Sequence, residues 1–254
     1  MSIKTGEGLT YQVSSATLAQ QPQHSSLEPL TSQQHITLSN ILHSMILYLI
    51  RHGESVYNRE GKIQGQTDVE LTEFGRQQAQ AIALGMTHLK LDAIIASPLQ
   101  RAYQTAEALA QEQGLEIQTH DGLKEINVGK FAGLRWPEVA DKFPEHADAW
   151  NAQEFDFVIP GGESRRMLQV RGVTALTEIA ALPYSQVAVV AHGGILCAAL
   201  KGILRIPDEL NPFSLFNASI SRLSWDGKWQ LLTLNQTEHL VRAGVLNETG
   251  KGNL

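Results

Sequence analysis

The sequence has little of what marks secreted, membrane-spanning or disulfide-stabilised proteins. Cys197 is the single cysteine among 254 residues, so no internal disulfide can form, which is consistent with a reducing compartment. The apolar run 45–50 is far too short to span a bilayer, and the chain does not open with the basic and apolar regions of a signal peptide. No arginine precedes Arg51, which argues against an organellar transit peptide. We therefore expect a cytoplasmic protein.

Excess positive charge is also lacking. The chain has 20 Lys and Arg against 26 Asp and Glu, which gives a formal net charge of -6. Such a chain is a poor candidate for binding nucleic acid or an anionic membrane, although a local basic pocket is compatible with it. With 43% hydrophobic residues, the length allows one α/β domain with a full core, or at most two small domains.

The first 44 residues differ in composition from the rest. They are rich in Gln, Ser and Thr, and their few large apolar residues follow no sustained period. Such a segment buries too little surface to offset its ordering entropy, so residues 1–44 are predicted to be a disordered N-terminal extension. Met45 directly precedes the first predicted strand. Either the natural start codon encodes Met45, or residues 1–44 are a genuine regulatory tail. Residues 45–245 are then the folded domain, and 246–254 a flexible C-terminal tail.

Strand-like and helix-like segments alternate over the folded domain. Strands are predicted at 46–50, 93–96, 117–120 and 187–191, and helices at 72–89, 98–113, 164–182 and 195–204. Near the end, Asp226-Gly227 separates runs 220–225 and 229–234, which predicts a hairpin. Alternating elements with buried strands indicate an α/β fold, a three-layer sandwich whose mostly parallel sheet is flanked by helices.

Local signals predict where two of these helices begin or end. Thr72 is the expected N-cap of the first. Ser97 opens a capping box with Pro98 at the first helical position, and Gly114 is expected to end that helix. In 164–182 an apolar residue recurs at every third position, which supports the helical prediction: Met167, Val170, Val173, Leu176 and Ile179.

Two histidines follow predicted strands, and each precedes a glycine. They are His52, in Arg51-His52-Gly53, and His192, in Ala191-His192-Gly193-Gly194. Ligands of open α/β sheets bind outside the carboxyl ends of the strands, so both histidines are expected to face one pocket. Glycines such as Gly193 let backbone amides approach an anion closely. The alternative, that each histidine merely caps a strand, does not explain the matched context.

Further residues near predicted strand ends favour a phosphate ligand. Arg51 directly precedes His52, and Arg101 lies in the first turn of a helix, where the dipole disfavours a cation. Guanidinium groups match phosphate oxygens bidentately, and Asn58 offers an amide donor. Glu125, expected at the end of a strand, is the best candidate acid.

These blocks together resemble the signature of the histidine phosphatase superfamily, the phosphoglycerate mutase-like proteins. The resemblance covers about residues 45–240 in the order of the family, and it rests on five blocks: Leu49-Ile50-Arg51-His52-Gly53-Glu54-Ser55 with Asn58, Ser97-Pro98-Leu99-Gln100-Arg101-Ala102 with Thr105, Glu125 before Gly129 and Gly133, Gly161-Gly162-Glu163-Ser164, and Ala191-His192-Gly193-Gly194. One block would be weak support; five in order are specific. The resemblance implies the phosphoglycerate mutase-like fold.

The resemblance also implies a reaction and roles for residues. Neutral His52 attacks phosphorus and becomes a phosphohistidine. Four residues hold the phosphoryl oxygens and stabilise their charge: Arg51, Arg101, His192 and Asn58. Glu125 protonates the leaving oxygen and then takes a proton from the attacking water. Gln64 and Gly65 match substrate contacts of the family.

Other phosphatase chemistries have no counterpart in the sequence. The residue six places after Cys197 is Ile203 rather than arginine, and there is neither an Asp-x-Asp motif nor a Walker A loop. No two of the nine histidines are spaced for chelation from one helical turn or strand. We therefore expect neither a metal nor a cofactor.

Three functions are compatible with the resemblance. The favoured one is hydrolysis of a small phosphorylated metabolite. The second is a bisphosphoglycerate-dependent phosphoglycerate mutase, against which stand the loop sequence Glu125-Ile126-Asn127 and the short gap before His192. The third is a pseudoenzyme that senses a phospho-ligand, although every core catalytic position is present. A homodimer is expected only by analogy with relatives.

For the substrate, the sequence gives one hint. Residues 234–240 resemble the end of metal-independent phosphoserine phosphatases, in which this segment closes over the ligand. L-phosphoserine is therefore the leading substrate, and His239 is expected to hydrogen-bond its carboxylate. Phosphatases of ribazole phosphate and sugar phosphates share much of the pattern.

We predict that exhaustive chelation leaves activity on phosphomonoesters unchanged, because no metal-ligand pattern is visible in the sequence. The measurement is turnover of an aryl phosphate before and after dialysis against a strong chelator. Loss of turnover that a divalent ion restores would contradict the metal-free assignment.

Overall fold

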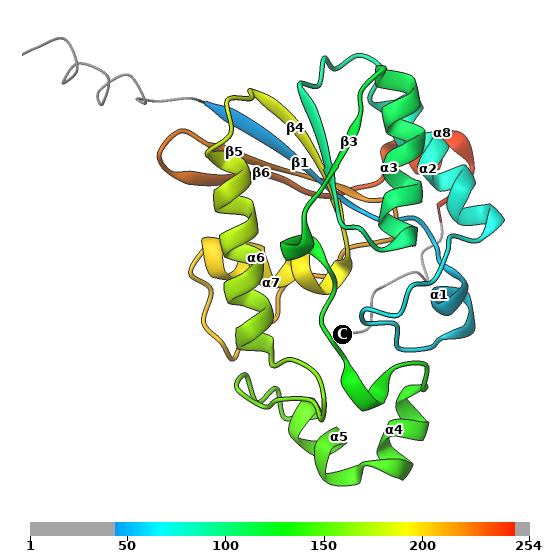
Figure 1. Ribbon diagram of the computed structural model, residues 1–254, viewed down its shortest axis with the longest axis vertical. Helices are drawn as coiled ribbons and strands as arrows, with labels where there is room; N and C mark the ends of the chain where they lie inside the picture. The colour runs from blue at the N-terminus through cyan, green and yellow to red at the C-terminus, as the bar shows by residue number, and fades with distance from the viewer. Residues whose placement is uncertain (1–43, 247–254) are drawn as a thin grey trace, which may run out of the picture. The chain divides into compact units, whose positions relative to one another are not determined.

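A sheet of six strands forms the centre of the folded domain in the computed structural model, which describes residues 44–246 (Figure 1). Apart from their boundary residues, the predicted N-terminal extension and C-terminal tail lie outside the described residues. In spatial order the strands are β3 (Ile117–Thr119), β2 (Ala93–Ala96), β4 (Gln186–Ala191), β1 (Met45–Arg51), β5 (Ile220–Trp225) and β6 (Trp229–Gln236). The first four are parallel neighbours, and the predicted β5–β6 hairpin continues the sheet antiparallel to β1.

Helices cover both faces of the sheet, as predicted. Alternate residues of β1 belong to different cores: Leu47 and Leu49 pack with α6 and α7, whereas Tyr48 and Ile50 pack with α2, α3 and α8. Burial on both faces explains why β1 reads as a continuous apolar run. The helices are α1 (Val56–Glu60), α2 (Glu73–Gly85), α3 (Gln100–Gln113), α4 (Trp136–Lys142), α5 (Pro144–Asn151), α6 (Arg165–Ala180), α7 (Gly193–Ile203) and α8 (Glu238–Ala243).

The parallel register aligns the carboxyl ends of the three central strands. Arg51 of β1 lies opposite Ala191 of β4, and Ala96 of β2 lies opposite Val190. The residues that follow these ends are therefore neighbours in space although they are far apart in the sequence. In Figure 1, α4 and α5 lie beyond this edge of the sheet.

Two glycines allow the loop after β1 to pack directly on α2. A Cβ on Gly75 would lie 2.0 Å from the carbonyl oxygen of Glu54, and a Cβ on Gly53 would lie 2.5 Å from that of Gly75. Neither position accepts a side chain without moving backbone. Thr72, the predicted N-cap of α2, is confirmed, since its hydroxyl accepts a hydrogen bond from the Gly75 amide at 2.9 Å.

Several predicted boundaries of helices and strands were wrong. The first helix ends at Gly85 rather than Leu89, and β3 ends at Thr119. The capping box at Ser97 does not form: Leu99 is the N-cap of α3 and makes no side-chain cap. The Ser97 hydroxyl is instead 2.8 Å from the ring of His192. The predicted end of α3 is confirmed, since Gly114 adopts the left-handed conformation with φ of 66°.

The helix predicted at 164–182 is confirmed as α6, but not all of its recurring apolar residues are buried. Met167 and Val170 are 49% and 59% exposed, whereas Leu168 is buried. A strict three-residue repeat advances 300° per step, so it drifts around a helix with 3.6 residues per turn. The buried residues instead follow spacings of three and four: Leu168, Gly172, Ala175, Leu176 and Ile179.

We predict that Gly75→Ala lowers the free energy of unfolding by at least about 2 kcal/mol, because the added methyl group overlaps the Glu54 carbonyl. Urea denaturation of the variant and of Gln77→Ala, an exposed position on the same helix, provides the comparison. Equal stability of the two variants would show that the loop yields without cost.

Candidate active site

Two buried histidine rings meet where β1 and β4 end. His52 and His192 directly follow these strands, and their ring centroids are 5.1 Å apart. Their exposed fractions are 2% and 0%. The prediction that the two histidines lie together is confirmed, and the aligned strand ends are the physical reason.

His52 is held in one tautomer. Its Nδ1 lies 2.6 Å from the carbonyl oxygen of Gly53, which can only accept, so Nδ1 carries the proton and Nε2 the lone pair. Burial, followed by the positive charges of Arg101 and Arg51, holds the pKa of His52 well below its usual value. The ring is therefore neutral and has an unprotonated nitrogen, as a nucleophile requires.

His192 has the complementary arrangement. The Ser97 hydroxyl accepts from the Leu99 amide at 3.3 Å and lies 2.8 Å from His192 Nε2, so it can donate to that nitrogen. The proton of His192 then resides on Nδ1, which is buried without a partner among the described residues. Burial, with Arg101 next, keeps the pKa of His192 well below its usual value. An unpaired buried N–H is a donor that an anion would satisfy.

Two buried guanidinium groups flank the histidines. Arg51 donates to the Leu215 carbonyl, whereas Arg101 donates to the carbonyls of Thr67 at 2.9 Å and Gly65 at 2.6 Å. Burial lowers the pKa of each to about 10, and Glu125 opposes that shift in both, so each keeps its charge at neutral pH. Arg101 Nε is buried and unpartnered within the described part of the chain.

Glu125 lies between this cluster and the N-terminus of α7. It follows a short 3-10 helix (Asp121–Leu123) rather than a strand, so its predicted position at a strand end was wrong. One carboxylate oxygen accepts from the amides of Ile126 at 2.9 Å and Ile195 at 3.0 Å, and the other accepts from Gly194 at 2.9 Å. These amides fix the carboxylate without any cationic side chain.

An ion pair between Arg171 and Glu163 supports the loop that carries Glu125. Arg171 of α6 bonds Glu163 at 2.8 Å and also donates to the backbone carbonyls of Gly122, Lys124 and Glu125. The carboxylate of Glu163 in turn accepts from the Asn127 amide at 2.7 Å. The Gly161-Gly162-Glu163-Ser164 block therefore contributes to the site by positioning.

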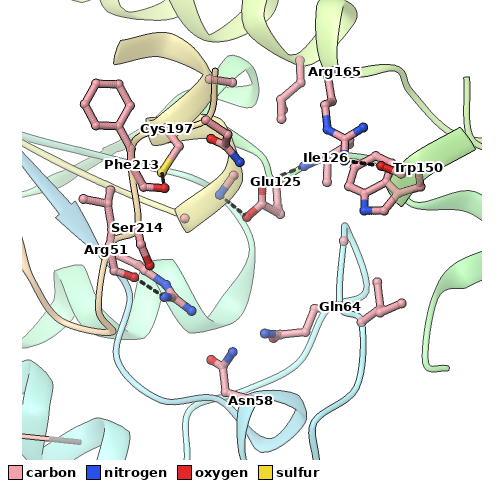
Figure 2. Close-up of a pocket in the computed structure, with 18 of the residues that line it drawn as sticks. Arg51, Asn58, Gln64, Glu125, Ile126, Trp150, Arg165, Cys197, Phe213 and Ser214 are labelled. Atoms are coloured by element: carbon pink, nitrogen blue, oxygen red, sulfur yellow. Dashed lines mark hydrogen bonds between the residues drawn. The ribbon is translucent and has the colours of Figure 1, made fainter. Parts of the chain in front are cut away.

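Two amide side chains complete the polar wall of the pocket. The oxygen of Asn58 accepts from the Ser55 amide and from Asn217, and the oxygen of Gln64 accepts from the Ser55 hydroxyl at 2.6 Å. With the oxygens engaged, the NH₂ groups are the ends available to a ligand, and Figure 2 shows both amides pointing into the pocket below Arg51.

The two glycines predicted as site residues, Gly65 and Gly193, contact the two arginines. The Gly65 carbonyl accepts from Arg101, as described above. Gly65 has a φ of +51°, and a Cβ there would lie 2.3 Å from the Val128 side chain. A Cβ on Gly193 would lie 3.3 Å from Arg51 Nε, so glycine there lets the guanidinium approach α7.

The pocket has a volume of about 300 Å³, which suits a small metabolite. Nearly all predicted site residues meet here. Those that line the pocket are Arg51, His52, Asn58, Gln64, Gly65, Arg101, Glu125 and Gly193, and His192 lies directly behind His52.

His239 is the exception. Its ring nitrogen lies 2.9 Å from the Ala218 carbonyl, and its side chain packs on Gly85 of α2, at a separate depression lined by α2 and α8. The predicted contact between His239 and a substrate carboxylate is therefore wrong. The packing of α8 on α2 turns this segment away from the pocket.

Sequence reasoning missed several residues of the pocket and its supports. Ser97 was interpreted as a helix cap, and Asn217, whose amide donates to the His52 carbonyl at 3.0 Å, lies in a segment without a pattern. Arg165 and Lys201 line the pocket from α6 and α7. Pro137 and Pro144 lie in the first turns of α4 and α5 and could have indicated these helices, which carry Trp136 and Trp150 of the pocket lining.

The fold and the site together define an α/β protein with a buried histidine pair and two buried arginines at its strand ends. The chain belongs to the histidine phosphatase superfamily (branch 1), whose family model matches residues 47–237. The family and fold predicted from the sequence are thereby confirmed.

Individual relatives agree with this assignment. The metal-independent phosphoserine phosphatase of Arabidopsis thaliana is 38% identical over 206 residues, which cover 79% of this chain and 85% of that one. Phosphoglycerate mutase-like protein 4 of the same plant is 33% identical over 204 residues, covering 79% and 89%. A solved complex of mycobacterial glucosyl-3-phosphoglycerate phosphatase with inorganic phosphate has a TM-score of 0.66 at 32% identity, covering 77% and 99%.

Two features are absent from the described residues 44–246. None of their helices has the length and apolar character needed to cross a membrane. Nor do these residues contain a group of three or more His, Cys, Asp or Glu side chains placed to hold a metal ion.

We predict that lowering the pH from 7.5 to 5.5 destabilises the protein partly through its buried histidines. Their pKa values are depressed on folding, so below about pH 6.5 the unfolded chain takes up protons that the folded chain does not. Stability present above that pH is then lost as pH falls, by at most about 1.4 kcal/mol per pH unit for each ring.

Urea denaturation at both pH values measures this loss for the wild type, for His192→Gln and for His88→Gln, which changes an exposed histidine. His192→Gln should lose part of the pH dependence and His88→Gln should keep it. An unchanged pH dependence in His192→Gln would mean that the buried ring titrates normally.

Proposed function

We propose that the protein hydrolyses small phosphomonoesters through a phosphohistidine on His52. The observation that carries this proposal is the state of His52 itself: a neutral ring with its lone pair on Nε2, beside two buried guanidinium groups in a pocket of metabolite size. Membership of the histidine phosphatase superfamily supports the same reaction.

In the first step, Nε2 of His52 attacks phosphorus. The N–P bond forms as the bond from phosphorus to the leaving oxygen breaks, and Glu125 in its protonated form gives its proton to that oxygen. The alcohol departs, leaving His52 phosphorylated and Glu125 ionised. The amides of Ile126, Gly194 and Ile195 then stabilise the carboxylate.

In the second step, a water molecule attacks the phosphohistidine. Glu125 takes the water proton, the O–P bond forms and the N–P bond breaks, which returns a neutral His52 and inorganic phosphate. One carboxyl group therefore acts as acid and then as base, and no proton is lost or gained over the cycle by the protein.

Positive charge for the transferred phosphoryl group comes from side chains. Arg51 and Arg101 line the position that the oxygens would occupy, and the amides of Asn58 and Gln64 lie on the other side. We propose that the Nδ1–H of His192, whose ring lies beside that of His52, completes the set. Because these donors are buried and fixed, they stabilise developing charge without reorganisation. We propose that this set makes a metal unnecessary.

For the substrate, we propose a small carboxylate-bearing phosphomonoester, with L-phosphoserine as the leading choice. The support is the plant relative named as a metal-independent phosphoserine phosphatase and a bacterial one, from Hydrogenobacter thermophilus, named phosphoserine phosphatase 1. With His239 outside the pocket, carboxylate recognition must come from other residues.

A bisphosphoglycerate-dependent mutase is the competing function. It is supported by one relative named phosphoglycerate mutase-like protein 4 and by another named probable phosphoglycerate mutase. The two reactions separate cleanly in one assay. A hydrolase releases inorganic phosphate from 3-phosphoglycerate, whereas a mutase converts it to 2-phosphoglycerate and is stimulated by 2,3-bisphosphoglycerate.

We predict that His52→Ala abolishes turnover while the fold is retained, because the nucleophile is removed. Hydrolysis of an aryl phosphate and the melting temperature are measured for this variant and for His88→Ala, its exposed counterpart. A folded His52→Ala protein with wild-type turnover would end the phosphohistidine mechanism, and a wild type without turnover would favour a phospho-ligand sensor.

We predict that Glu125→Gln slows the phosphorylation step by about 100-fold or more for alkyl phosphates and far less for nitrophenyl phosphate. An alkoxide needs the proton, whereas nitrophenolate leaves without it. Single-turnover kinetics isolate this step, and Glu107→Gln, on the exposed face of α3, is the control. Equal losses for both substrates would assign the proton to another group.

A further inference from the structure

The pocket extends past Glu125 to a second group of residues, the distal cluster, formed by Trp150, Phe155, Arg165 and Lys201. In Figure 2, Glu125 lies between Arg51 on one side and Arg165 with Trp150 on the other. None of these distal residues has a role in the phosphoryl transfer described above.

Arg165 is fixed in place by the α5 segment. Its guanidinium lies over the Trp150 ring, 3.5 Å from the centroid, and its Nη2 donates to the Trp150 carbonyl at 3.1 Å. Its Nη1 is buried and has no hydrogen-bond partner within residues 44–246. The group is therefore rigid and keeps an unsatisfied donor, which is costly unless a ligand completes it.

The charge of Arg165 is also uncompensated by the described residues. No carboxylate of residues 44–246 forms an ion pair with it, and burial alone lowers its pKa to about 10, so it is charged at neutral pH. By contrast, the charge of the neighbouring Arg166 is compensated by two carboxylates, those of Asp156 and, at 3.0 Å, of Asp208. Arg165 lies in the first turn of α6, where the helix dipole disfavours a cation.

Lys201 adds a second positive charge nearby. Its Nζ donates to the Asp208 carbonyl at 2.6 Å and lies 4.7 Å from the centroid of the Phe155 ring. Burial lowers its pKa, and the positive charge of Arg165 acts in the same direction. Two cations held close together on aromatic rings form an anion-binding end of the pocket.

We propose that the substrate carries a second anionic group, a carboxylate or a phosphate, that binds Arg165 with support from Lys201. This inference rests on the proposed function, because the first anion is the phosphoryl group at His52. The pocket of about 300 Å³ has room for one small metabolite that carries both anions. The distal cluster then determines specificity, since the phosphoryl end binds a group common to all phosphomonoesters.

The test compares substrates that differ only in the second anion. Carboxylate pairs are O-phosphoserine with O-phosphoethanolamine and 3-phosphoglycerate with glycerol 3-phosphate; fructose 1,6-bisphosphate with fructose 6-phosphate is the phosphate pair. The wild type should prefer the doubly anionic member in the carboxylate or the phosphate arm, which identifies the group. Hydrolysis of both members of every pair with equal kcat/KM would overturn the proposal.

Variants assign that preference to Arg165. Arg165→Met should lower kcat/KM for the preferred member by about ten-fold or more and change its partner substrate and nitrophenyl phosphate little. Arg165→Lys should restore part of the loss, and Arg166→Met, next in sequence, should match the wild type. Equal losses on both members of a pair would show that Arg165 only supports the structure.

Binding separates this inference from the proposed function. Calorimetry on the His52→Ala background gives dissociation constants for the same compounds without turnover. Weaker binding of the doubly anionic member alone after adding Arg165→Met supports the distal site even if the wild type hydrolyses none of the compounds. Unchanged binding in that double variant would overturn it even if the hydrolase mechanism stands.

Discussion

The parallel pairing of β1 with β4 is the constraint on which the site depends. Its register places Arg51 opposite Ala191, so His52 and His192 follow at the same edge of the sheet. The pairing of β4 with β2 adds Ser97, which orients the ring of His192. A slip of one residue would send each side chain to the opposite face of the sheet and separate the histidines.

Burial keeps the two histidine rings in their neutral form. Both rings are excluded from water beside guanidinium groups, so they are neutral, and His52 keeps a lone pair on Nε2. Backbone carbonyls of Leu215, Thr67 and Gly65 accept hydrogen bonds from the two arginines and orient them. Guanidinium groups match phosphate oxygens bidentately, so a phosphate dianion suits this pair.

The sequence was informative where chemistry and local structure coincide. Buried strands read as apolar runs, and a histidine or arginine directly after such a run is placed by the strand itself, which is why His52, His192 and Arg101 were predicted correctly. Positions that depend on tertiary packing were not. His239 follows α8 onto α2, and Met167 lies on the exposed side of α6 because the actual helical period differs from three.

The distal cluster was missed for the same reason. Arg165 had no partner in the sequence pattern, since its position over Trp150 results from how the chain between α5 and α6 folds back. No spacing rule links these two residues with Lys201 of α7. The end of the pocket that contains the two histidines was therefore predictable from motifs, whereas the end proposed to select the substrate required the three-dimensional structure.

The most direct test of the account is to identify the phosphorylated residue during turnover. Rapid quenching into alkali, which preserves phosphohistidine, followed by peptide mass spectrometry locates the phosphoryl group. The account predicts phosphate on the peptide that contains His52, formed at a rate that matches or exceeds steady-state turnover. Phosphate on another residue, or steady-state turnover without any phosphorylated peptide, would contradict it.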